Sequence, residues 1–135
     1  MEFNKLVARQ MTDAQNERDV NKLQEILAPN FKSHISDRPY PLNRDQYIQG
    51  VLMSHMAFRD LKFTIEDMVG EGEKVVLRIK AKGLHSGLYL GIAATQREVE
   101  FAGFAIRRII EGKVVEEWQT NDQLHLLRQL GEELK

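Results

Sequence analysis

The feature that most constrains the fold is the alternating stretch of residues 113–122, KVVEEWQTND, near the end of the chain. In a strand, alternate side chains lie on opposite faces, so one face carries Val114, Glu116, Trp118, Thr120 and Asp122. A strand usually directs its large aromatic residue toward the covered face, which predicts that Trp118 points inward with Glu116 and Asp122. Carboxylates beside a tryptophan are costly to bury unless they are paired, protonated or used in chemistry. We therefore expect the rest of the chain to fold around a polar set on this face.

The first third of the chain is expected to form two helices and a short strand. Residues 2–15 carry apolar side chains at the spacing of three and four that is typical of an amphipathic helix. Asp19 is a suitable N-cap for a second helix, which ends at Pro29. Residues 31–36, which include His34, follow as a short strand.

The next helix is predicted from a capping box. Asn43 followed by Gln46 is the pattern in which each side chain bonds the other residue's backbone N–H. The helix should continue to about Ala57, with Tyr47 on its apolar side.

From residue 60 onward the apolar period changes to two, which indicates strands. We expect a hairpin over residues 62–82 with a turn at 70–72, then a long strand over residues 98–110. The strand of Trp118 follows, and Asn121 or Asp122 caps a closing helix. Helices followed by a run of strands favour an α+β fold, in which a strongly bent sheet packs against the helices and leaves an apolar pocket. We expect a single domain over residues 1–135.

Composition excludes several classes of function. The chain has no cysteine, so disulfides, thiol nucleophiles and thiolate metal sites are absent. The net charge is −1 with scattered Lys and Arg, which gives no support for binding to nucleic acid or to an anionic membrane. No apolar run spans a bilayer and the N-terminus has no signal-like apolar core, so we expect a cytoplasmic protein.

The two carboxylates of the predicted inward face each have a structural and a functional interpretation. Asp122 either caps the closing helix through backbone N–H bonds or acts as a general acid and base in an apolar pocket. Glu116 either pairs with a cation such as Arg78 or Arg107 or contacts the substrate. Trp118 is core or pocket wall, and as an apolar neighbour it would raise the pKa of a carboxylate.

The histidines do not form a metal-binding pattern. His85 shares the phase of the apolar residues in its strand, and a lone histidine there is usually a hydrogen-bonded core or rim residue. His34 is similar, and no H-x-x-x-H or H-E-x-x-H spacing occurs, so we expect no metal. The chain also lacks a nucleophile elbow, a phosphate loop and a dinucleotide fingerprint.

These motifs together resemble the SnoaL-like polyketide cyclases, also called ester cyclases, of the nuclear-transport-factor-two-like (ketosteroid-isomerase-like) superfamily. The family pattern places an Arg in a Val-rich strand, then Gly-Thr-His-x-Gly, Gly-Ile-x-x-Thr-Gly-Arg, Ile-Val-Glu-x-Trp, an Asp four residues after the Trp, and Gln-Leu-Gly. The matching positions are Arg78, residues 83–87 with His85, residues 91–97, residues 114–118, Asp122 and residues 129–131. The sequence departs from the pattern at Leu84, Ala93, Ala94 and Gln96.

The resemblance implies a cone-shaped fold, with a curved mixed or antiparallel sheet wrapped around the N-terminal helices and a deep apolar pocket. It implies a cofactor-free reaction in which the carboxylate matching Asp122 removes a proton from an activated carbon and the carbanion closes a ring by an aldol step. His85 and His34 would be catalytic pocket residues. The substrate, a small apolar or aromatic carbonyl compound, would contact Glu116, Trp118, Phe104, Arg78 and Tyr47. The family commonly forms homodimers or higher homo-oligomers through the outer sheet.

The sequence is compatible with an enzyme and with two alternatives. The first alternative is a non-catalytic module of the same fold that binds a small ligand or dimerises, with Asp122 only a cap and Glu116 only an ion-pair partner. A second alternative, an epoxide-type hydrolase, would need Arg78 beside Asp122 and Glu116, and the strand phase argues against an inward Arg78.

Overall fold

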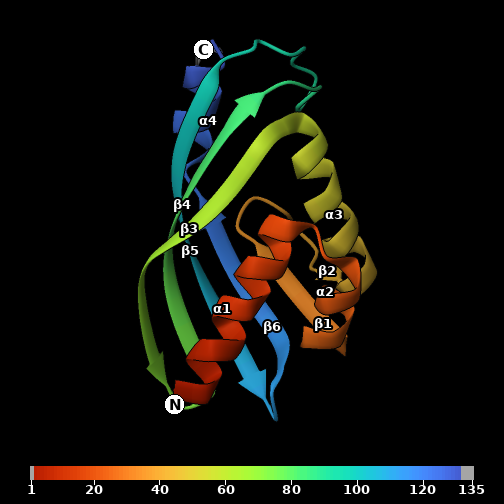
Figure 1. The fold of residues 1–135 in the computed structure, drawn as a ribbon, viewed down its shortest axis with the longest axis vertical. Coiled ribbons are helices and arrows are strands. Elements are labelled where there is room, and N and C mark those ends of the chain that lie inside the picture. Colours follow the sequence, from red (N-terminus) through yellow and green to blue (C-terminus); the bar gives the residue numbers. More distant parts are fainter. Residues whose placement is uncertain (1, 132–135) are drawn as a thin grey trace.

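In this computed structural model, which describes residues 2–131, three helices pack against one face of a curved sheet (Figure 1). The helices on this face are α1 (Glu2–Glu17), α2 (Val20–Ile26) and α3 (Arg44–Ala57), and α4 (Gln123–Gln129) closes the described chain. The strands are β1 (Leu27–Ile35), β2 (Leu42–Asn43), β3 (Phe58–Glu71), β4 (Lys74–His85), β5 (Glu98–Ile110) and β6 (Lys113–Asn121). The predicted α+β cone is therefore confirmed, with a six-stranded sheet that is curved and not closed.

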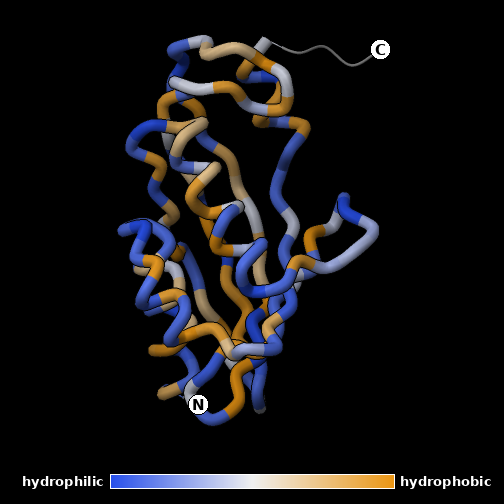
Figure 2. Tube along the Cα trace, turned by 90° about the vertical axis from the view of Figure 1, so that its right-hand side faces the viewer, coloured by the Kyte–Doolittle hydropathy of each residue, from blue (hydrophilic) through white to orange (hydrophobic). Residues whose placement is uncertain are grey.

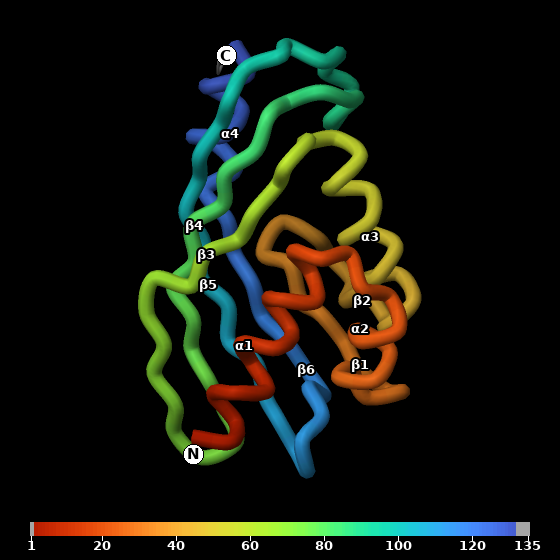
Figure 3. Tube along the Cα trace, in the orientation of Figure 1, coloured from red at the N-terminus to blue at the C-terminus, as the bar shows by residue number. Residues whose placement is uncertain are grey.

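The strand order is β2-β1-β6-β5-β4-β3. Neighbouring strands are antiparallel except β1 and β6, which are parallel, so the sheet is mixed. The N-terminus and α4 lie at opposite ends of the molecule, and α1 crosses the sheet diagonally (Figure 3). We call the face of the sheet toward α1 the inner face and the opposite face the outer face.

The local signals place most helices and strands correctly. Asp19 caps α2 and Asn43 forms the predicted capping box with Gln46 at the start of α3. The boundaries of α2 and β1 differ from the prediction, because the helix ends at Ile26 and Leu27 already pairs with Val114. The β3–β4 turn also lies later than predicted, because β3 extends to Glu71.

Apolar side chains gather in two clusters on the inner face. The larger lies under α1, α2 and α3, and includes Met11, Leu23, Phe31, Leu77 and Ile109. The smaller lies where α3, β3 and α4 meet, and includes Phe58, Leu61, Val99, Leu126 and Leu130. Hydrophobic and hydrophilic residues alternate along the strands of the trace, as expected for a sheet with one covered face (Figure 2).

Candidate functional site

The alternation of β6 is interrupted by a bulge, and this corrects the prediction for Trp118. Val114 pairs with Ile109 and Glu116 pairs with the adjacent Arg108, so Val115 has no partner on β5. A one-residue shift moves every following side chain to the other face. Glu117 therefore lies in the core with 1% of its surface exposed. Glu116 and Trp118, which we expected to point inward, lie on the outer face.

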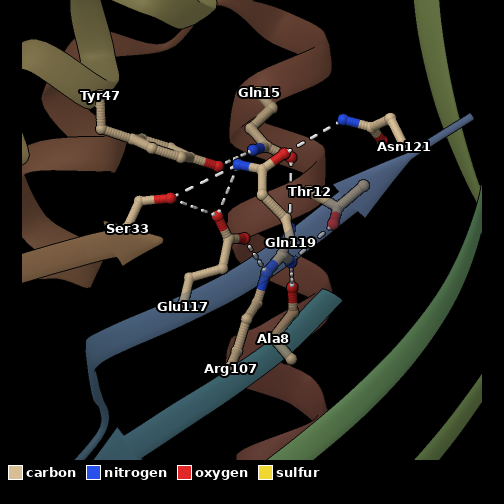
Figure 4. Close-up of polar contacts among 9 residues, drawn as sticks. All are labelled: Ala8, Thr12, Gln15, Ser33, Tyr47, Arg107, Glu117, Gln119 and Asn121. Atoms are coloured by element: carbon tan, nitrogen blue, oxygen red, sulfur yellow. Dashed lines mark hydrogen bonds and ion pairs between the residues drawn. The ribbon is translucent and has the colours of Figure 1, made fainter. Parts of the chain in front are cut away.

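Glu117 forms a buried ion pair with Arg107 (Figure 4). The guanidinium Nε donates to Glu117 Oε2 at 2.9 Å, and both side chains are 1% exposed. Arg107 Nη1 also donates to the Ala8 carbonyl at 2.6 Å and to Thr12 Oγ1 at 2.7 Å. These bonds tie α1 to β5 and β6, and they compensate for taking both charges out of water.

Tyr47, predicted to contact substrate, belongs to this buried network. Its hydroxyl accepts a hydrogen bond from Gln15 Nε2, and its ring packs edge-on against Phe31 with 5.2 Å between centroids. Burial, with a further contribution from the Glu117 charge, holds the pKa of Tyr47 well above its usual value. The phenol therefore stays protonated over the whole neutral range.

The network continues toward solvent along the inner side of β6. Gln119 Nε2 donates to Glu117 Oε1 at 3.0 Å, and this fixes the orientation of the Gln119 amide. The Gln119 oxygen then accepts from Asn121 Nδ2 at 3.4 Å. A line of polar groups thus leads from the buried carboxylate to the exposed Asn121.

Asp122 follows Asn121 and forms the N-cap of α4. Its backbone N–H bonds the Ala102 carbonyl at 2.9 Å, and its Oδ1 accepts from the His125 N–H at 3.0 Å. The cap predicted at this position is confirmed. Asp122 is exposed, and its Oδ2 has no hydrogen bond or ion pair to any residue in 2–131. One oxygen is thus held by the helix while the other is available.

His85 is fully buried beside Phe58, at the far end of β4. The Thr95 N–H donates to His85 Nδ1 at 3.2 Å, so the neutral ring carries its proton on Nε2. Within the described chain, Nε2 is the buried side-chain polar atom that lacks a hydrogen-bond partner.

His85 and Asp122 do not meet. The backbone N–H of Asp122 donates a hydrogen bond to the Ala102 carbonyl of β5. Ala102 lies opposite Lys80 of β4, and Lys80 precedes His85 by five residues in that strand. At about 3.3 Å per residue, the two positions are about 16 Å apart along the sheet. The predicted pair of catalytic groups is therefore separated.

His34 lies on the outer face, where its ring stacks on Trp118 with 5.5 Å between centroids. His34 Nε2 is 2.7 Å from Glu116 Oε2, and Arg108 Nη2 donates to Glu116 Oε1 at 3.2 Å. Partial burial raises the pKa of Glu116, but the bonds from His34 and Arg108 outweigh it and leave the pKa lowered. The expected inward grouping of His34 and Glu116 with Asp122 and His85 is wrong, because the bulge turns Glu116 outward.

The remaining predicted substrate contacts also lie on the outer face. Phe104 is 52% exposed and pairs with Thr120, and Arg78 is exposed with Asp67 Oδ2 at 3.7 Å. The outward direction of Arg78 agrees with its strand phase. A shallow groove of about 310 Å³ lies here, lined mainly by His34, Phe104, Ile106, Trp118 and Thr120. We call this the outer groove.

The structure also has a larger cavity that the sequence did not suggest. It has a volume of about 560 Å³ and lies between the ends of α1 and α3 and the start of β3. Polar and charged side chains form most of its wall. No group of three or more His, Asp or Glu side chains in residues 2–131 is placed to hold a metal ion.

Sequence reasoning missed Glu117, Gln119 and the larger cavity. A signal for the bulge was present, because each strand of the hairpin contains two consecutive apolar residues that break strict alternation, Ile109-Ile110 and Val114-Val115. The cavity had no local signal, since its residues come from four separate segments.

Comparisons with known proteins agree with the observed fold. AclR from Streptomyces galilaeus, described as a candidate hydroxylase, is 25% identical with a TM-score of 0.89, and 99% of each chain is covered. IdmH from Streptomyces antibioticus, described as a candidate polyketide cyclase, is 27% identical with a TM-score of 0.85, covering 96% of this chain and 99% of IdmH. TsrD from Streptomyces laurentii is also 27% identical, with a TM-score of 0.85, covering 97% of this chain and 96% of TsrD.

The comparison with curated proteins found no match. No helix in residues 2–131 is long and apolar enough to cross a membrane. The profile of the SnoaL-like polyketide cyclase family matches residues 5–130, nearly the whole chain. The chain therefore belongs to the SnoaL-like polyketide cyclase family.

Proposed function

We propose that this protein is a cofactor-independent cyclase or isomerase that moves a proton on a small carbonyl compound, with Asp122 as the base. Family membership supports chemistry on a small molecule. The observation that carries the proposal is the state of Asp122, whose Oδ1 is held by the His125 N–H while Oδ2 has no partner in the described chain. A carboxylate oriented in this way presents one free oxygen in a fixed direction, as a general base requires.

The proposed reaction conserves its protons. Asp122 Oδ2 takes a proton from a carbon next to a carbonyl, and the electron pair of the C–H bond moves into the carbonyl to give an enolate. In a cyclase, the enolate carbon then attacks a second carbonyl of the same molecule and forms the new C–C bond. The protonated Asp122 returns its proton to the alkoxide that this attack creates.

The other predicted residues take different parts in this proposal. His85 carries a buried N–H without a partner, but its distance from Asp122 excludes action on the same carbon, so we assign it no part in the proton transfer. Tyr47 supports the ligand site indirectly through the Glu117 network. Gln119 and Asn121 provide polar groups next to Asp122.

A binding protein without catalysis is the second candidate. Asp122 is exposed and caps α4, and a helix cap alone would account for an Asp at this position. In that case the ligand would bind without any transfer of a proton.

Asp122→Asn separates the two candidates, because Asn caps a helix about as well as Asp but is not a base at neutral pH. We would follow hydrogen–deuterium exchange at the activated carbon of aryl β-diketones and of ortho-acyl arylacetic methyl esters by NMR in deuterated buffer. If Asp122 is the base, the variant should lose about 100-fold or more of the exchange rate with little change in stability. Binding of these compounds without Asp122-dependent exchange would favour the binding protein.

We also propose that the outer face forms a homodimer. Phe104 and Val76 are exposed there, and Ile106 and Trp118 line the adjoining outer groove. Cations of β4 alternate with acidic side chains of β3 and β5, as in the Lys80 pairs with Glu66 and Glu100. An apolar centre with both signs of charge around it suits self-association about a two-fold axis.

A further inference from the structure

The larger cavity lies where α1 and α3 end beside the start of β3. Its volume of about 560 Å³ lies within the range of small-molecule sites. The side chains around it come from the end of α1 and the residue that follows it, from α3, from β3 and from the segment after β4. They are Asn16, Arg18, His55, Arg59, Asp60, Leu61, Lys62 and Ser86.

The cavity is locally basic although the chain as a whole has a net charge of −1. Arg18, Arg59 and Lys62 are exposed, and Asp60 is the acidic residue in the wall. None of these three cations forms an ion pair or a side-chain hydrogen bond with another residue in 2–131. Elsewhere on the surface, cations such as Lys80 and Arg108 do have acidic partners.

One carbonyl at the end of each helix has donors other than these cationic side chains. The Gln15 carbonyl of α1 accepts from the Arg18 backbone N–H and lies 2.8 Å from His55 Nε2. The Ala57 carbonyl of α3 accepts from the backbone N–H groups of Ser86 and Gly87. These two carbonyls therefore do not hold the cationic side chains, which are free to contact a ligand.

His55 adds a further polar group to the cavity wall. Because the Gln15 carbonyl only accepts, His55 must carry a proton on Nε2, and its Nδ1 has no partner in the described chain.

We propose that this cavity binds the anionic group, carboxylate or phosphate, of a small organic molecule. Arg18, Arg59 and Lys62 would surround the anion, since guanidinium and ammonium groups are the usual partners of both oxyanions. The buried Leu61 gives the cavity an apolar wall for the body of the ligand. The cavity is larger than a bare inorganic anion requires, which favours an organic ligand. This proposal does not depend on the role of Asp122.

The test uses 2-naphthoate, with neutral 2-naphthylmethanol as the matched ligand and inorganic phosphate as the anion without an apolar body. Binding would be followed by two-dimensional ¹H–¹⁵N NMR, using the backbone amides of Arg59, Lys62 and Ser86 as reporters. We expect 2-naphthoate to shift these amides and to bind more tightly than either of the other probes. Raising the salt concentration to about 1 M should weaken binding, because the Debye length falls to about 3 Å.

The variant Arg59→Gln/Lys62→Gln should weaken naphthoate binding about tenfold or more, because the loss of each exposed cation should lower the affinity by a factor of a few. Arg9→Gln is the control, because Arg9 is exposed on α1 and is not part of the cavity wall. All three substituted side chains are exposed, and the amide spectrum reports directly whether the variants fold. Equal affinity for 2-naphthylmethanol, equal weakening by Arg9→Gln, or shifts confined to other regions would overturn the proposal. Tighter binding of phosphate than of 2-naphthoate would overturn the inference that the ligand is an organic molecule.

Discussion

At the scale of the residue, the buried pair of Arg107 and Glu117 organises the interior. The guanidinium has acceptors from α1 and β6, and the carboxylate accepts from Arg107, Ser33 and Gln119. Taking two charges out of water is costly, and these bonds offset the cost only while both partners are present. The pair therefore sets the position of Gln119, and through it that of Asn121 beside Asp122.

Removing one member of the pair should cost more than removing both. We expect Glu117→Leu to lower the free energy of unfolding by about 3–5 kcal/mol, because it leaves a buried, unpaired guanidinium. The double variant Glu117→Leu/Arg107→Met should be less destabilised than Glu117→Leu alone. Urea unfolding followed by circular dichroism measures both. Asp67→Ala, which breaks an exposed pair with Arg78, is the control and should cost less than about 1 kcal/mol. Equal costs for the exposed and buried pairs would contradict this account.

Tyr47 should make stability depend on alkaline pH. Burial raises its folded-state pKa well above that of the unfolded chain, about 10. Above that pH the unfolded chain releases the proton more readily than the folded protein does. The contribution of Tyr47 is therefore fully present below about pH 10 and is lost as the pH rises further. Urea unfolding of the parent and of Tyr47→Phe between pH 8 and pH 11 isolates this contribution. We expect the free energy of unfolding to decline less steeply with pH in the variant. Parallel declines would show that Tyr47 ionises equally in both states.

At the scale of the element, Gly103 allows β5 and β6 to carry Asn121 on the inner face. A Cβ at Gly103 would lie 2.3 Å from Asn121 Oδ1 and 2.9 Å from the Thr120 carbonyl oxygen. Side chains do not approach each other so closely, and the carbonyl belongs to the backbone and cannot turn away. Only glycine fits at this position without moving β6.

Gly103→Ala should therefore destabilise the protein by about 1–3 kcal/mol, as is usual for overpacking. Adding Asn121→Ala should recover part of the loss but not all, because the contact with the Thr120 carbonyl remains. The control is Gly50→Ala in α3, where a Cβ meets nothing within 4 Å and the helix should gain up to about 1 kcal/mol. Thermal unfolding ranks the three variants, and a neutral Gly103→Ala would refute the steric argument.

The positions of helices and strands were easier to predict from the sequence than the face of the sheet on which each side chain lies. The capping box at Asn43 and the cap at Asp122 depend on neighbours within three residues, so local sequence contains the required information. The direction of Trp118 depends on whether Val115 is paired, which is decided by residues of β5. A strand read by itself cannot show a bulge that its partner strand creates.

At the scale of the whole molecule, the outer face leaves Phe104 and its apolar neighbours without a covering layer among the described residues. We expect Phe104→Lys to weaken the proposed dimer by about 30-fold or more, since a central aromatic residue commonly contributes at least about 2 kcal/mol to an interface. Analytical ultracentrifugation over a range of concentrations measures the dissociation constant. Met53→Lys, at an exposed position of α3, is the control and should leave association unchanged. A parent that stays monomeric at high concentration would exclude the dimer.

The α+β class, the order of the main helices and strands, the family and a helix cap at Asn121 or Asp122 could all be predicted from the sequence, because they follow from short-range spacing and local hydrogen bonding. Which carboxylate is buried follows from the packing of the strands, since only the register of β5 against β6 places Glu117 opposite Arg107. The tertiary structure also separates His85 from Asp122 and brings Arg18, Arg59 and Lys62 around one cavity. Such arrangements depend on strand register and on the packing of helices that are distant in sequence, and these long-range contacts leave no periodic signal along the chain.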